Sequence, residues 1–167
     1  RNHLIMDKIG FLDLKEQNAQ VKDEIFDQFE KVFEKTAFSG GPFVKEFEEG
    51  FSKYTGAKYT VAVSSGTDAI HLMCIAAGIE QNDEVIIPAN TFIASPWGVV
   101  YQKAKPVFVD CDPDTWQIDP SKIEEKITSR TKAIMGVHLY GQPFERDAVV
   151  QIAEKYNLLV LEDTAQA

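Results

Sequence analysis

One segment of the chain has the residue types of a phosphate-binding turn. Ser64-Ser65-Gly66-Thr67-Asp68 follows an apolar, β-branched run and leads into a helical pattern. Free N–H groups and the helix dipole at such a helix start bind phosphate without a basic side chain, and Gly66 lets a ligand approach the backbone. The same pattern is explained by Ser65 or Thr67 capping the helix, so both interpretations are open. The spacing fits neither GxxxxGK[ST] nor GxGxxG, which disfavours a P-loop NTPase or a standard dinucleotide fold.

An aromatic residue and a carboxylate follow two other apolar runs. Phe92 comes after the run at 84–87 and either joins the core or lies flat against a planar ligand ring. Asp163 follows the run at 158–161. A carboxylate at the end of a buried strand is costly unless it is paired, so we expect Asp163 to meet a cation or several donors, the alternative being a cap of the next loop. Together, the three features describe a receptor for a flat, phosphorylated, cationic heterocycle. Pyridoxal 5'-phosphate (PLP) matches this description, because its electron-sink role needs a carboxylate that keeps the pyridine nitrogen protonated.

The elements that position these residues are predicted from apolar spacing. One long amphipathic helix is predicted at 14–33, and a second follows the breaker cluster at 39–42 and ends near Gly56. From residue 59 onward, short β-branched runs alternate with helical stretches. The predicted strands are 59–63, 84–87, 106–109, 133–137 and 158–161. The predicted helices between them are 67–77, 92–102, 120–127 and 145–156.

This alternation predicts an α/β fold. Nearly continuous apolar strands separated by helices suit a mostly parallel sheet that is covered on both faces, which is a three-layer α/β/α arrangement. The chain contains no repeat or linker-like tract after residue 56. We therefore predict a helical N-terminal arm at 1–56 and one ligand-binding α/β domain at 57–167.

The composition excludes several classes of protein. The 167 residues are 44% hydrophobic, which is typical of a globular domain. The net charge of -9 disfavours nucleic acid and acidic membranes as partners. The apolar stretch at 69–79 is too short to span a bilayer. Cys74 and Cys111 suggest neither a metal site nor a disulfide framework, so we expect a cytoplasmic protein. The first residues lack the pattern of a signal peptide, and Met6 is a candidate natural start.

Several blocks of the chain resemble a known family in their order and spacing. They are Ser-Gly-Thr-Asp-Ala at 65–69, Pro-Ala-Asn-Thr-Phe at 88–92, Pro-Val-Phe-Val-Asp at 106–110, Val-His-Leu-Tyr-Gly-Gln-Pro at 137–143 and Glu-Asp-Thr-Ala-Gln-Ala at 162–167. They resemble the successive motifs of the DegT/DnrJ/EryC1/StrS family, the PLP-dependent sugar aminotransferases of fold type I. Phe-Leu-Asp-Leu at 11–14 is similar to the family's N-terminal segment, so the resemblance runs from about residue 9 to the end.

The resemblance implies a cofactor site made of Ser65, Gly66, Thr67, Phe92, Asp163 and Gln166. Residues 65–67 match the phosphate-binding turn, and Phe92 matches the aromatic residue that stacks on the pyridine ring. Asp163 matches the acid that pairs with the pyridine nitrogen, and Gln166 matches the amide near the phenolic oxygen of the cofactor. We interpret His71 and His138 as structural, although His138 also matches a family position.

The resemblance also implies a reaction. Family members transfer an amino group to a nucleotide-linked keto sugar for carbohydrate biosynthesis, and by analogy glutamate is the amino donor. The resemblance also leads us to expect a homodimer. Their Schiff-base lysine lies downstream of the Asp-x-x-Gln block, and Lys58, Lys105 and Lys155 match no such motif. We therefore expect these residues to be the N-terminal part of a longer enzyme, lacking the small C-terminal domain and inactive alone. The alternatives are a PLP-dependent sugar dehydratase of the same family and a non-catalytic binding module.

Overall fold

The computed structural model describes residues 10–167, so the candidate start at Met6 lies outside the described part. The chain divides into two compact units, one that ends at Ala62 and one that spans Val63–Ala167. The predicted division after residue 56 lies earlier in the chain than this boundary and remains a proposal about domain organisation. Within residues 10–167, no helix is long and apolar enough to cross a membrane.

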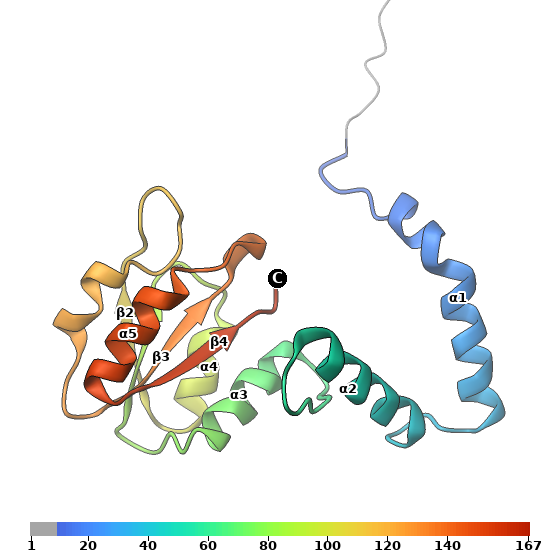
Figure 1. Cartoon of the computed structure of the whole chain (residues 1–167), viewed down its shortest axis with the longest axis horizontal. Coiled ribbons are helices and arrows are strands. Elements are labelled where there is room, and N and C mark those ends of the chain that lie inside the picture. The colour runs from blue at the N-terminus through green and yellow to red at the C-terminus, as the bar shows by residue number, and fades with distance from the viewer. Residues whose placement is uncertain (1–9) are drawn as a thin grey trace, which may run out of the picture. The chain divides into compact units, whose positions relative to one another are not determined.

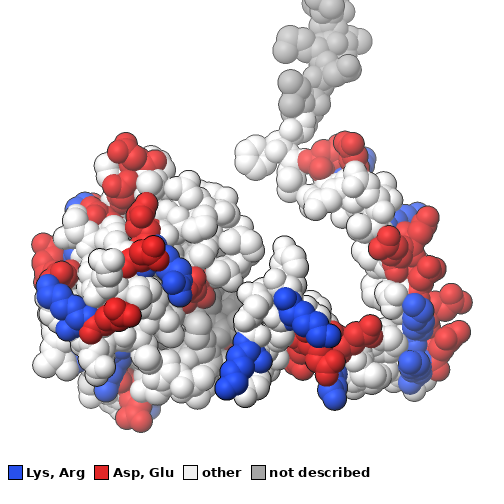
Figure 2. Space-filling model, in the orientation of Figure 1, with Lys and Arg blue, Asp and Glu red and all other residues white. Residues whose placement is uncertain are grey.

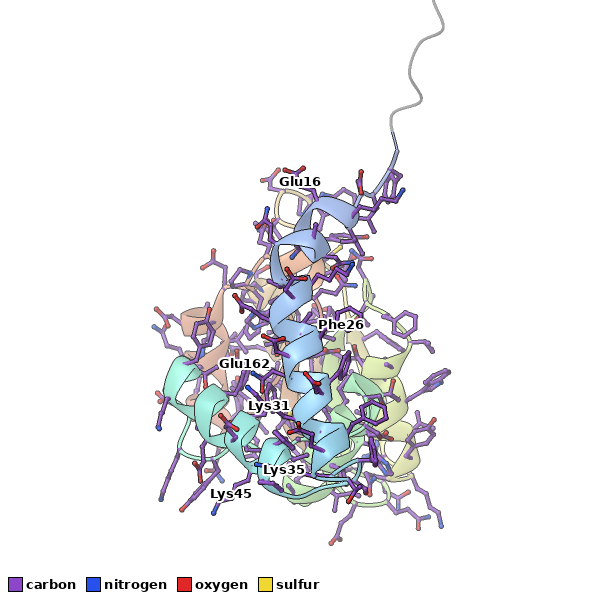
Figure 3. The ribbon with its side chains drawn as sticks, turned by 90° about the vertical axis from the view of Figure 1, so that its right-hand side faces the viewer. Glu16, Phe26, Lys31, Lys35, Lys45 and Glu162 are labelled. Carbon is purple, nitrogen blue, oxygen red and sulfur yellow. The ribbon has the colours of Figure 1, made fainter. Side chains whose placement is uncertain are left out.

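The first unit contains the two helices that the apolar spacing predicted, α1 (Lys15–Glu34) and α2 (Pro42–Thr55). Glu16 in the first turn of α1 and Lys31 in its last turn complement the helix dipole, and Figure 3 shows them with Phe26. Proline at the start of α2 suits a position whose N–H needs no partner, and Gly56 ends α2 with a φ of 75°.

No residue of α1 is buried against the rest of the described chain. In Figure 2, charged side chains cover one side of this helix and uncharged ones the other. Three phenylalanines recur on α1 at helical spacing, Phe26, Phe29 and Phe33, and they are 60%, 54% and 66% exposed. The helix therefore presents an apolar stripe of the kind that normally packs against another element.

The second unit is built on a parallel sheet, as predicted (Figure 1). Its strands are β1 (Glu84–Pro88), β2 (Lys105–Val109), β3 (Thr131–Val137) and β4 (Leu159–Asp163). Their order in the sheet is β2-β1-β3-β4, and every pairing is parallel. All four carboxyl ends therefore lie at one edge of the sheet.

Helices cover both faces of this sheet (Figure 1). The helices are α3 (Gly66–Ala76), α4 (Ala94–Tyr101) and α5 (Arg146–Tyr156). Alternate residues of one strand point to opposite faces. On β1, Val85 and Ile87 join the core with α3 and α4, whereas Ile86 joins the core with α5. The predicted three-layer arrangement is confirmed.

Two predicted elements are wrong. Residues 59–63 are extended but pair with no strand of the described chain, and Val61 is 76% exposed. The backbone N–H of Ala62 donates instead to Oε1 of Glu48, at 2.8 Å. An apolar, β-branched composition suits a strand, but a strand also needs a neighbour for its ladder, and composition does not supply one.

The predicted helix at 120–127 consists of two short 3-10 helices, Pro120–Lys122 and Glu124–Lys126. Asp119 caps the first of them by accepting from the N–H of Ser121 at 2.9 Å. The backbone is extended again at Ile127, with a ψ of 129°. The predicted α-helix does not form, because local side-chain bonds to the backbone favour short turns over a continuing helix.

Candidate active site

A pocket of about 180 Å³ lies at the carboxyl ends of the strands. The start of α3, the segment after β1, the end of β3 and the end of β4 all contribute to it, through Gly66, Thr67, Ile70, Thr91, Phe92, Ala94, Val137, Leu139, Asp163, Ala165 and Gln166. Ligands of open parallel sheets bind at this edge. Five of the six predicted site residues line the pocket, and Ser65 is the exception.

The start of α3 presents unpaired backbone donors to this pocket. The N–H groups of Gly66 and Thr67 have no hydrogen-bond partner within residues 10–167. A Cβ placed on Gly66 would lie 3.6 Å from Cβ of Ala165, so the helix start lies directly beside the loop after β4. The start of α3 and Asp163 therefore line the same pocket, although the strand expected before α3 is absent from the sheet.

Ser65 acts as the cap of α3. Its hydroxyl accepts from the N–H of Asp68 at 3.1 Å and lies 3.0 Å from Oδ2 of the same residue. The hydroxyl of Ser64 also donates to this carboxylate. The bond from Ser64 has the larger effect and the bond from Ser65 the smaller one, and both lower the pKa of Asp68 below its ordinary value of 3.8. The capping interpretation of Ser65 is therefore the one observed, and its role in phosphate binding stays a prediction.

Asp163 is a buried carboxylate whose partners are neutral. It is 7% exposed. Its Oδ2 accepts from the hydroxyl of Ser95 at 2.7 Å, and its Oδ1 accepts from the N–H of Ala165 at 3.2 Å. In the part of the chain that the structure describes, no Lys, Arg or His forms an ion pair with it. Asp163 thus has two neutral donors, and the bond from Ala165 is the cap of the next loop that the sequence left open as the alternative. Within the described residues, the negative charge has no counter-charge.

Glu84, the other deeply buried carboxylate, shows how a purely structural acid is treated. It lies at the start of β1, the end of the sheet opposite the pocket, and is 1% exposed. Arg130 and Lys105 pair with its Oε1 at 2.9 and 3.2 Å, and the hydroxyl of Thr128 donates to its Oε2 at 2.6 Å. The Thr128 bond, followed by those from Lys105 and Arg130, lowers the pKa of Glu84. Its charge is balanced within the protein, whereas that of Asp163 is not.

Phe92 lies at the mouth of the pocket and is 65% exposed, so it does not belong to the core. Its carbonyl accepts from the N–H of Ser95 at 3.1 Å, which fixes the turn that leads into α4. An exposed ring beside an apolar pocket is available to lie against a planar ligand.

Gln166 is held by a turn that follows β3. Its Oε1 accepts from the N–H of Tyr140 at 2.7 Å. Tyr140 and the following Gly141 both have left-handed backbones, with φ of 59° and 83°. A positive φ at a tyrosine is uncommon, and it directs the Tyr140 N–H toward Gln166. Because Oε1 accepts this bond, the NH₂ group of Gln166 is the one left to donate to a ligand.

Neither histidine that we interpreted as structural lines the pocket. Nε2 of His138 lies 3.1 Å from Oε2 of Glu162, and Arg146 donates to Oε1 of the same carboxylate at 3.0 Å. The ring of His71 packs edge-on against Tyr101, with centroids 5.1 Å apart. Among residues 10–167, no lysine lines the pocket, and no group of three or more His, Cys, Asp or Glu could hold a metal ion.

Ser95 and Thr91 were not among the predicted site residues. Ser95 is fully buried in α4, and its Oγ lies 2.8 Å from Oγ1 of Thr91. Ser95 and Asp163 are 68 residues apart in the chain, so no local pattern links them. The only available signal is the hydroxyl pair at i and i+4 around a helix start, and that pattern is common.

Comparison with known proteins places this geometry in a family. The chain is 49% identical to the dTDP-3-amino-3,6-dideoxy-alpha-D-galactopyranose transaminase of Aneurinibacillus thermoaerophilus, over 95% of this chain and 44% of the relative. The crystal structure of DesV from S. venezuelae in complex with a ketimine intermediate is 38% identical, with a TM-score of 0.92 over 96% of this chain and 43% of that one. The structure of ntda from Bacillus subtilis with bound cofactor PMP is 41% identical, with a TM-score of 0.89 over 95% and 37%.

The chain thus spans less than half the length of these relatives. The model of the DegT/DnrJ/EryC1/StrS aminotransferase family matches residues 19–167. This match covers the α3 turn, Phe92 and the end of β4, so the resemblance seen in the sequence motifs is confirmed. The chain belongs to the DegT/DnrJ/EryC1/StrS aminotransferase family.

Proposed function

We propose that the protein to which these residues belong is a PLP-dependent aminotransferase that moves an amino group from glutamate to a nucleotide-linked keto sugar. The name of the A. thermoaerophilus relative supports a sugar carried on a nucleotide, and the PMP-bound B. subtilis structure supports the cofactor. Glutamate as the donor rests on the family resemblance.

The observation that carries the proposal is the uncompensated charge of Asp163. A buried carboxylate with only neutral donors is costly, and a cationic ligand atom in the pocket would remove that cost. The pyridinium nitrogen of PLP is such an atom. The other lining groups fit the rest of the molecule, because the free N–H groups at the start of α3 suit a phosphate and Phe92 suits an aromatic ring.

The residues of the chain would divide the work as follows. The N–H groups of Gly66 and Thr67 would bind the phosphate, and Phe92 would hold the ring by stacking. Asp163 would keep the proton on the ring nitrogen, and the NH₂ group of Gln166 would donate to the phenolic oxygen. When bound, PLP supplies the electron sink for amino-group chemistry.

The substitution Asp163→Asn in the full-length protein tests this proposal. An amide has no charge with which to stabilise a protonated ring nitrogen, so we expect turnover to fall roughly 100-fold or more, as when one preorganised electrostatic group is lost. The fall in PLP affinity should be much smaller. Asp110→Asn is the control, because Asp110 follows β2 at the same edge of the sheet but is exposed and lies outside the pocket. Near-parental turnover of Asp163→Asn would remove the assigned role.

Product analysis separates the proposed reaction from the alternatives. An aminotransferase converts one glutamate into one 2-oxoglutarate for each amino sugar formed. A dehydratase would release an oxygen from the sugar as water, and a binding module would leave the sugar unchanged. Detection of a deoxygenated sugar without a new amine would replace our proposal with the dehydratase.

We also propose a homodimer. The exposed aromatic stripe on α1 (Phe26, Phe29 and Phe33) offers apolar surface that assembly would cover. Light scattering of the full-length protein at assay concentration should give twice the monomer mass. An active monomer would contradict this expectation.

A further inference from the structure

We infer that Ser95 is a positioning residue that aims the carboxylate of Asp163 at the ring nitrogen of the cofactor. The inference rests on the proposed function, because it concerns the same pocket. It adds a residue that touches neither the cofactor nor the substrate and acts through the acid. Ser95 does not line the pocket, although Thr91 and Asp163 on either side of it do.

The direction of the hydrogen bonds follows from the number of protons. An ionised carboxylate only accepts, so the hydroxyl of Ser95 must donate its single proton to Oδ2 of Asp163, 2.7 Å away. The Oγ1 atom of Thr91 lies 2.8 Å from Oγ of Ser95. With the Ser95 proton already used, Thr91 is the donor in that contact. The three residues form a directed chain from Thr91 through Ser95 to Asp163.

This chain holds the acid without neutralising it. The bond from Ser95 occupies Oδ2, and the N–H of Ala165 occupies Oδ1, so both oxygens are fixed. Neither donor carries a charge, and the full negative charge remains available to a cation in the pocket. Glu84 shows the contrasting arrangement, in which ion pairs with Arg130 and Lys105 neutralise the negative charge.

Ser95 also connects the acid to the aromatic side of the pocket. Its backbone N–H donates to the carbonyl of Phe92 at 3.1 Å, while its side chain donates to Asp163. Ser95 is fully buried within α4. One rigid residue therefore fixes both the turn that carries the ring-stacking residue and the acid for the ring nitrogen. Positioning of this kind reduces the reorganisation that ligand binding requires.

The test compares PLP with its 1-deaza analogue, in which a C–H group replaces the ring nitrogen. Dissociation constants of both are measured by equilibrium dialysis on the full-length protein. The preference for PLP is the dissociation constant of the analogue divided by that of PLP. If Ser95 acts through Asp163 on the ring nitrogen, Ser95→Ala weakens the binding of PLP much more than the binding of the analogue. We expect the preference for PLP to fall about tenfold, which corresponds to about 1.4 kcal/mol. Thr91→Val should lower the preference by a smaller factor, because Thr91 acts one bond further away.

A matched control exists in this chain. The hydroxyl of Ser121 donates to Oδ1 of Asp119 at 2.6 Å. Neither of these two residues lines the pocket. Ser121→Ala removes the same kind of bond and should leave the preference for PLP unchanged.

The outcomes separate this inference from the proposed function. If Ser95→Ala weakens PLP and the analogue equally, Ser95 only packs the site and the inference is overturned. If Asp163→Asn lowers the preference and Ser95→Ala does not, the inference fails while the proposed function stands. If neither Asp163→Asn nor Ser95→Ala changes the preference, the pairing of Asp163 with the ring nitrogen is wrong and the proposed function falls with it.

Discussion

Gly98 marks the closest approach of two helices, and replacing it with alanine should displace one of them. A Cβ at Gly98 of α4 would lie 2.6 Å from Cγ2 of Ile70, 3.1 Å from the carbonyl carbon of Ile70 and 3.2 Å from the backbone nitrogen of His71, both in α3. A side-chain methyl can rotate away, but the two backbone atoms move only with the helix. Gly98→Ala therefore forces α3 away from α4.

The size of the effect follows from two opposing contributions. Overpacking of a filled core costs about 1–3 kcal/mol. Alanine in place of a helical glycine gains about 0.5–1 kcal/mol. We expect Gly98→Ala to lower the free energy of unfolding by about 1–2 kcal/mol. Because α3 begins with Gly66 and Thr67, the same shift should weaken PLP binding.

Chemical denaturation followed by circular dichroism measures this change. Gly50→Ala is the control, since Gly50 lies in α2 and a Cβ there would meet no described atom within 4 Å other than those of its chain neighbours and of its own helix backbone. It should leave the protein as stable as before or slightly more stable. Adding Ile70→Leu to Gly98→Ala removes the Cγ2 atom and should restore part of the loss. A Gly98→Ala variant as stable as its parent would refute the close helix contact.

Two further predictions concern buried groups outside the pocket. The hydrogen bond from Thr128, followed by the bonds from Lys105 and Arg130, holds the pKa of Glu84 below 4.5. The ionised Glu84 therefore stabilises the fold fully above about pH 4.5, and this contribution is lost as the pH falls through the lowered pKa. Glu84→Gln should cost about 2 kcal/mol at neutral pH, and a stability difference that does not shrink on acidification in denaturation curves would contradict this account. Burial raises the pKa of Cys74 to about 11, so a thiol reagent at pH 8 should label the half-buried Cys111 first. Equal labelling rates in peptide mapping would show that Cys74 is accessible.

The sheet was predictable wherever burial dictates composition. Strands covered on both faces, such as 84–87 and 133–137, need apolar residues at nearly every position, and that signal is local. Residues 59–63 carry the same signal, but strand formation depends on a neighbour in the sheet, and the described chain offers none. An apolar, β-branched composition indicates that a segment is able to pair, but it does not indicate which strand it pairs with.

The candidate site was predictable where position along the fold decides the role. Phe92 and Asp163 lie at or just after the ends of apolar runs that form strands, and the parallel sheet brings such positions to one edge, whereas the run before Gly66 joins no strand of the described chain. The Tyr140 turn that orients Gln166 was not predictable, because it depends on a positive φ at a non-glycine residue. A backbone conformation of that kind is stabilised by its surroundings and leaves no mark in composition.

The two buried carboxylates of the sheet differ in whether the described chain provides a positive partner for them. Desolvation costs both of them free energy. Glu84 recovers that cost within the chain, from Arg130 and Lys105 at the amino ends of the strands. Asp163 at the opposite edge receives only two neutral hydrogen bonds within the described chain, so a ligand with a positive charge would offset the remaining desolvation cost. Such a pocket should favour a protonated ring over a neutral one of the same shape, and this preference follows from burial and geometry without reference to the reaction.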